Sequence, residues 1–349
     1  MPSDPRKAFL TYKNYLDAFW TAIAVYYLPS RYLHLRLGQS HDVLEALAER
    51  VRASLSFIRL KQRDTELDSA SLRRILRNAW GTEFLLASTG QLPDEELMGI
   101  ANNWAVVQAY YACYHAAQAL LIARGQPRPE DHATTLHQSA EFWIKTELPP
   151  WALGHQSGKF LGFPRDVDDT IHAWSNCGTD NCWDLAAKSL RTTRKEPLDD
   201  RFRKERLKKK ADRRRVWQDE EKRRLEAGRP PRNQPKFPTP ILSSADRARL
   251  DRGLSPTTLL DYLCRLRLRS NYKDPTMFTD GPEDASESRS VHRYLCGITS
   301  ATLLVHELHV GQLIGQHRLA HLVDEWLGIL AVRSQELGLA ARQDILLHS

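Results

Sequence analysis

Apolar residues in this chain recur at intervals of three and four, the spacing that places side chains on one face of an α-helix. Such stretches cover 5–27, 42–60, 71–88, 96–123, 256–269, 292–331 and 334–347. No internal repeat and no alternation typical of strands is present. The sequence therefore predicts an all-α fold. Its central helix would be 96–123, with an apolar stripe of Ile100, Trp104, Val107, Tyr111, Tyr114 and Leu121.

Composition narrows the class of protein further. Apolar residues make up 42% of the chain, enough for a core, and charged residues make up 27%. The apolar run from Phe19 to Leu28 is shorter than the roughly 20 residues that span a bilayer. Five scattered cysteines suit reduced thiols, and the polar N-terminus has no signal-peptide pattern. These features predict a cytoplasmic protein that does not enter a membrane.

Positive charge is concentrated in one segment, residues 191–236. It holds nineteen Lys and Arg against nine Asp and Glu, a net charge of +10, whereas the whole chain carries +7. The rest of the chain therefore sums to −3. A localised basic segment concentrates positive potential where a polyanion can dock, and RNA or another nucleic acid is the expected partner.

We expect this segment to form a helix that begins near Pro197 and ends at Gly228, followed by a proline-rich return path over 229–243. Five acid–base pairs at i,i+4 spacing would support it: Asp199–Arg203, Asp200–Lys204, Glu205–Lys209, Asp219–Arg223 and Glu220–Arg224. Cations surround more than one turn, and a tryptophan beside them offers a stacking surface. The predicted nucleic-acid contacts are Arg206, Lys208, Lys209, Lys210, Arg213, Arg214, Arg215 and Trp217. The alternative is a solvated, salt-bridged helix or a linker.

Part of the central helix carries a family-like pattern. The run Asn102–Leu121 includes Tyr110-Tyr111-Ala112, His115-Ala116-Ala117 and a Leu pair, and Gly125 with His132 or His137 follows. A second stretch, Arg267–Asp274, is similar to an Arg-x-x-Ala-Asp-Tyr pattern, with Ser270-Asn271 in place of Ala-Asp. Together they resemble the HEPN (higher eukaryotes and prokaryotes nucleotide-binding) family.

The HEPN resemblance implies a helical bundle with an inserted charged arm. We expect an N-terminal helical region at 1–92, a first part of the bundle with a loop-rich extension at 93–190, the arm at 191–243 and a second part at 244–349. It also implies a homodimer, and a nucleic-acid-binding protein of prokaryotic antiviral defence or toxin type. Many family members are metal-independent endoribonucleases, and others are binding or scaffolding subunits of larger complexes.

The catalytic pattern of the family is Arg-x(4–6)-His, in which histidine transfers protons and arginine stabilises charge on phosphate oxygens. Three matches occur, no more than chance gives: Arg36–His41, Arg165–His172 and Arg342–His348. Arg165 and His172 are the preferred pair because Asp166 follows the arginine. A second candidate set, from the two family-like stretches, is Arg269, Asn271, Tyr272 and His115. The alternative for this set is helix capping and hydrogen bonding within the core.

Two groups have metal-ligating residue types. His306, His309, His317, His321 and Asp324 fall on one arc of a helix, for which a polar face or a subunit contact is the favoured interpretation. His172, Cys177 and Cys182 lack a firm fourth ligand. We therefore expect no metal and no other cofactor.

Overall fold

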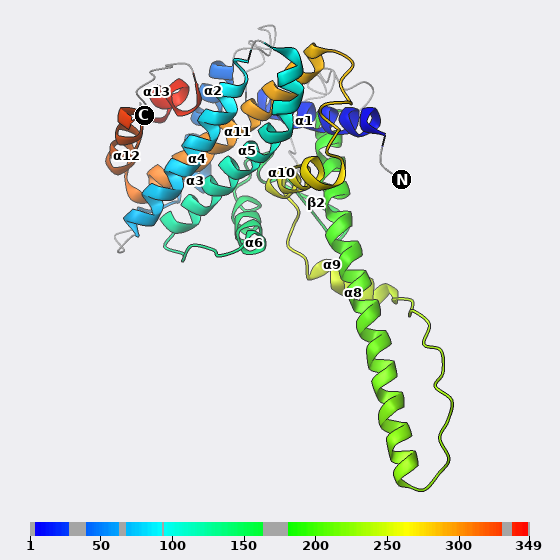
Figure 1. Cartoon of the computed structure of the whole chain (residues 1–349). Coiled ribbons are helices and arrows are strands. Elements are labelled where there is room, and N and C mark those ends of the chain that lie inside the picture. The colour runs from blue at the N-terminus through cyan, green and yellow to red at the C-terminus, as the bar shows by residue number, and fades with distance from the viewer. Residues whose placement is uncertain are drawn as a thin grey trace.

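Two long helices, α5 (Glu95–Ala123) and α11 (Ala285–Ile314), pack along each other at the centre of the protein (Figure 1). The computed structural model describes residues 4–27, 40–62, 68–92, 94–162, 181–329 and 337–347. In these residues the fold is helical apart from one two-stranded hairpin, which confirms the all-α prediction. No helix in the described ranges has both the length and the apolar character needed to cross a bilayer.

Four helices surround the central pair. α4 (Ser69–Thr89) packs along α5, α1 (Pro5–Tyr27) and α2 (Ser40–Ala53) pack against α11, and α10 (Leu259–Leu268) contacts α5. The N-terminal region therefore shares one core with the later helices. Smaller elements complete this part: α3 (Leu55–Ile58), α6 (His132–Trp143), the π-helical turn η2 (Arg269–Lys273), α12 (Gln316–Ile329), the 3₁₀ turn η3 (Gly338–Arg342) and α13 (Gln343–Leu347).

Small side chains allow α5 its central position. The fully buried face of the helix is a row of alanines with Cys113 and Tyr110, which permits close approach of α4 and α11. The predicted apolar stripe is wrong as a core face at its N-terminal end. Ile100 is 53% and Trp104 63% exposed, and Leu97 beside them is 47% exposed. Periodicity identified the helix, whereas residue size decided which face is buried.

The hairpin pairs β1 (Gly154–Gln156) with β2 (Lys159–Leu161) in antiparallel register. Ser157 and Gly158 both have positive φ, at 51° and 76°, as the tight turn requires. His155 also pairs with Thr257, which attaches the hairpin to the segment before α10. At three residues each, these strands are too short to show alternation, so the sequence pattern does not predict them.

The longest element is α8 (Cys182–Glu226), whose outer half projects from the bundle as an arm (Figure 1). The predicted start at Pro197 is wrong, because α8 begins at Cys182, capped by the side chain of Asn181. Pro197 lies inside the helix. Its missing N–H removes one helical hydrogen bond, and burial of the first turns against α1 holds the helix through this position.

Arg194 anchors the root of the arm. This side chain is 2% exposed and hydrogen-bonds the Asp251 carboxylate at 2.7 Å and four backbone carbonyl oxygens, of His155, Asp251, Leu254 and Ser255. These partners lie in the hairpin, in α9 (Ser244–Arg252) and in the loop after it. One arginine therefore joins three segments at the point where α8 leaves the body.

The predicted end of the arm is confirmed. Gly228 has φ 72°, its N–H bonds the carbonyl oxygen of Leu225, and that of Arg229 bonds Arg224. This double closure is a Schellman motif, which favours glycine at the left-handed position. Residues 229–243 then return without regular secondary structure, as predicted.

Candidate nucleic-acid interface

The outer half of α8 exposes a group of cations. The side chains of Lys208, Lys210, Arg213, Arg214 and Arg215 are exposed. Within the described residues, none of these five has a carboxylate within 4.0 Å. An unpaired cation on a projecting helix can reach a phosphate without first losing an internal partner. These residues form an exposed basic surface on the outer half of α8.

Two other predicted contacts, Lys209 and Arg206, are less available to a ligand. Lys209 forms an ion pair with Asp246 of α9 at 2.5 Å, and this contact, with Ser243, lowers the pKa of Asp246 to about 2. Arg206 is half-buried. The predicted i,i+4 pair between Glu205 and Lys209 is wrong, because Glu205 pairs with Arg249 of α9 at 2.7 Å. Residues of α9 therefore neutralise Lys209 and Glu205 of α8, and the outer half of α8 stays basic.

Trp217 is half-covered by the return path. Its ring meets Phe237 edge to face, with centroids 6.4 Å apart, and the Arg232 guanidinium lies 6.0 Å from the Trp217 ring. Arg232 is fixed in turn by Glu221, which accepts bonds from its backbone N and its Nε, both at 2.6 Å. The tryptophan holds helix and return path together, and part of its surface remains open.

The second predicted set does not form one contact group. Arg269 pairs with Glu196 of α8 at 2.7 Å and with Asp274, which follows η2, at 3.0 Å. These two carboxylates neutralise its charge. Tyr272 is 76% exposed and Asn271 is half-buried in the same turn. His115 lies instead among the tyrosines of α5, its ring stacked on Tyr111 with centroids 6.1 Å apart.

A neighbouring arginine, Arg267, lies beside these aromatic residues in place of the predicted Arg269. Its Nη1 donates to the Tyr111 hydroxyl at 2.8 Å, and its guanidinium lies 4.8 Å from the Tyr110 ring and 5.3 Å from the Tyr111 ring. The Tyr110 hydroxyl bonds His132 Nδ1 at 2.6 Å. We call Arg267, Tyr111, His115 and His132 the Arg267 cluster. All four are half-buried.

The Arg267 cluster combines a cation with neutral imidazoles. Burial and the nearby Arg267 charge lower the pKa of His132, and burial, with Arg128 and His132, lowers the pKa of His115. Within the described residues Arg267 has no carboxylate partner, and its Nε has no hydrogen bond. The signal was present in the sequence, since Arg267 opens the second family-like stretch and His132 follows Gly125.

Most residues of the three Arg-x(4–6)-His matches lie outside the part of the chain that the structure describes. Arg165, His172, Arg36 and His348 lie outside the described residues, so the preferred pair stays a prediction. Arg342 is described and is 0% exposed. It donates to Glu83 Oε1 at 2.5 Å and to Glu307 Oε1 at 2.6 Å, between α4 and α11. Its position excludes Arg342 from a substrate site and gives it a structural role.

The histidine arc divides between core and surface. His306 and His309 are buried in α11, whereas His317 and His321 are exposed on α12, after Gly315 ends α11 with φ 94°. The predicted polar face is therefore wrong for the first two. In the described ranges, no group of three His, Cys, Asp or Glu is placed to hold a metal ion. Of the possible zinc ligands, Cys182 is buried, and His172 and Cys177 lie outside these ranges.

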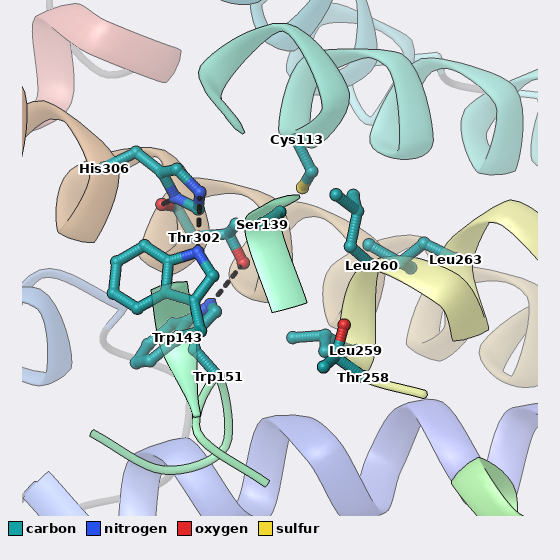
Figure 2. Close-up of a pocket in the computed structure, with 10 residues that line it drawn as sticks. All are labelled: Cys113, Ser139, Trp143, Trp151, Thr258, Leu259, Leu260, Leu263, Thr302 and His306. Carbon is teal, nitrogen blue, oxygen red and sulfur yellow. Dashed lines mark hydrogen bonds between the residues drawn. The ribbon is translucent and has the colours of Figure 1, made fainter. Parts of the chain in front are cut away.

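An interior cavity lies beside His306 (Figure 2). Trp143 donates from Nε1 to His306 Nε2 at 3.2 Å, and Trp151 donates to the Thr302 hydroxyl at 3.0 Å. Burial raises the pKa of the Cys113 thiol to about 12, so this side chain stays protonated. Because its polar groups are already paired and its thiol is unreactive, the cavity belongs to the core.

Comparison of the chain with protein-family models, with curated proteins and with solved structures finds no match.

Proposed function

We propose that this protein binds nucleic acid, RNA in the first instance, through the outer half of α8, and that it acts in the cytoplasm as a HEPN-like protein of defence or toxin type. The observation that carries the binding proposal is the set of five exposed cations that have no carboxylate partner among the residues that the structure describes. The resemblance of 102–121 and 267–274 to HEPN supports the family assignment.

Binding through phosphate contacts has a measurable salt dependence. If six phosphates are neutralised, the log–log slope of affinity against salt is expected at roughly −4 to −5, because each contact releases counterions. Replacing Lys210 and Arg214 with alanine removes two contacts and should make the slope shallower by about 1.4 on a single strand. Fluorescence anisotropy with labelled RNA across a salt series measures both. A flat salt response would contradict nucleic-acid binding by the arm.

A second candidate function, metal-independent cleavage of RNA, is favoured by the Arg267 cluster. A neutral His132 can accept the proton of a ribose 2′-hydroxyl as the 2′-oxygen attacks phosphorus. The bond from phosphorus to the 5′-oxygen then breaks, a 2′,3′-cyclic phosphate forms, and the leaving oxygen takes a proton from solvent. The fork of Arg267 would stabilise the charge on the non-bridging oxygens.

Cleavage of labelled RNA in the presence of a chelator tests this function. Arg267→Ala is expected to lower kcat on the order of 10²–10³-fold, and His132→Ala on the order of 10²–10⁴-fold. Arg269→Ala is the matched control two residues away, since Glu196 and Asp274 already hold that side chain. Thermal unfolding shows whether each variant is folded. Cleavage that survives both changes but is lost in Arg165→Ala would move the site to the earlier predicted pair.

The alternative is a non-catalytic binding or scaffolding subunit. Leu97, Ile100 and Trp104 form an exposed apolar stripe on α5, of the kind that subunit interfaces cover. A homodimer or a larger complex would cover it. A Trp104→Glu variant that becomes monomeric while the wild type sediments as a dimer, without any RNA cleavage, would favour this alternative.

A further inference from the structure

A groove runs between the outer half of α8 and the return path. It is lined by Leu207, Lys210, Ala211, Arg214, Gln234, Lys236 and Phe237, and holds roughly 990 Å³ of empty space, part of it open to solvent. The helix residues are spaced three and four apart, so they share one face of α8. Residues from the return path form the opposite wall. Figure 1 shows this path running alongside the helix.

One end of the groove is clamped. Glu221, on the same face of α8, holds Arg232 through two hydrogen bonds, and Arg224 Nε donates to the Pro230 carbonyl at 3.0 Å. Trp217 and Phe237 then close the space between helix and return path by their edge-to-face contact. These contacts keep the two walls apart at a set spacing, so the groove is built into the arm.

The chemistry of the lining is selective. Lys210, Arg214 and Lys236 are exposed cations, Gln234 offers an amide, and Phe237 offers a half-buried ring. No lining residue is acidic. Cations beside an aromatic floor recognise phosphates and base faces together, because a base stacks on the ring while its phosphate meets the cation.

We propose that this groove binds single-stranded nucleic acid, with Lys210, Arg214 and Lys236 on the phosphates and Phe237 stacked on a base. The proposal rests on the proposed nucleic-acid binding and names its site and its strand class. A duplex hides its base faces in the stack, so the aromatic floor contributes only to a single strand. An acidic peptide would use the cations but not the ring.

A neighbouring face of α8 provides a matched control. Lys208, Arg215 and Lys222 recur at seven-residue intervals and are exposed, and the groove lining does not include them. Removing Lys210 and Arg214 changes the net charge by the same amount as removing Lys208 and Arg215. Any difference between the two double variants therefore comes from position and not from total charge.

The experiment compares a labelled single strand with a duplex of the same sequence at one salt concentration, using the full chain. Lys210→Ala with Arg214→Ala is expected to weaken single-strand binding at least 10-fold more than Lys208→Ala with Arg215→Ala. Phe237→Leu should weaken single-strand binding on the order of 5–100-fold and leave duplex affinity within 2-fold, because only unpaired bases stack on the ring. Circular dichroism confirms that the arm stays helical in each variant.

Each outcome has a distinct meaning. Equal losses for both double variants would overturn the groove and leave nucleic-acid binding by the arm standing. If binding is unchanged in both double variants and also after deletion of 206–236, the proposed function itself is overturned. Displacement of the single strand by poly-glutamate at equal charge concentration, with no effect of Phe237→Leu, would assign the groove to an acidic protein partner instead.

Discussion

Arg342→Leu is expected to lower the free energy of unfolding by about 3–5 kcal/mol. Arg342 is fully buried and bonds two buried carboxylates, Glu83 and Glu307. Without the guanidinium, both carboxylates remain in a region that excludes water. Burial already raises the pKa of Glu83, although Arg342 acts to lower it. Loss of Arg342 therefore leaves the cost of burying these carboxylates uncompensated. Chemical denaturation of wild type and variant at neutral pH measures the change.

Isosteric changes separate charge from packing. Glu307 accepts three hydrogen bonds, one from Trp80 and two from Arg342, whereas Glu83 accepts two, from Arg342 and Ser300. Glu307→Gln is therefore expected to cost more than Glu83→Gln, because an amide nitrogen cannot accept. Arg203→Leu is the exposed control, and its pair with Asp200 is worth at most about 1 kcal/mol. Equal costs for Arg342→Leu and Arg203→Leu would refute the role of the buried network.

Acidification from pH 7 to pH 5 is expected to cost about 4 kcal/mol of stability through two buried histidines. Burial lowers the pKa of His306 to about 3 and that of His309 to about 4. In the unfolded chain both titrate near pH 6.5, so below that value the unfolded state binds more protons. Stability then falls by about 1.4 kcal/mol per pH unit per histidine, until the folded pKa is reached.

A hydrogen bond from Trp143 adds to burial in keeping His306 neutral. Its Nδ1 donates to the Thr302 carbonyl at 2.7 Å, and its Nε2 accepts from Trp143, so a second proton would face a donor. His306→Gln supplies one donor and one acceptor without titrating, and should halve the dependence of unfolding free energy on pH. His317→Gln, the same substitution at an exposed position of α12, is the control. Parallel profiles for all three proteins would contradict the assignment.

Local patterns predicted the elements whose causes are local. Three-and-four spacing gave α1, α4 and α5, and Gly125 and Gly228 marked helix ends because a left-handed residue is required there. α6 was missed because most of its residues are polar or small, although Asp131 caps it. α9 has no buried residue, so no apolar period marked it.

Charged residues in the core escaped prediction for a different reason. Arg194 and Arg342 are buried only because partners far along the chain accept their hydrogen bonds, and nothing in the neighbouring residues announces this. Partners far along the chain also decide which arginine lies at the candidate site. Arg267 and Arg269 are equivalent in sequence, yet Glu196 of α8 engages Arg269 and leaves Arg267 beside His132 and Tyr111. Pro197 predicted a helix start that the structure does not have. Burial of the preceding turns outweighs the cost of a proline inside the helix.

The continuity of α8 sets a length scale for whatever the arm holds. From Arg194 at the root to Trp217 beside the groove there are 23 residues of unbroken helix, about 35 Å at 1.5 Å per residue. At 3.4 Å per base pair this equals about ten base pairs of duplex. A ligand that touched both Arg194 and Trp217 would have to span this length, and a shorter one could reach only one of them.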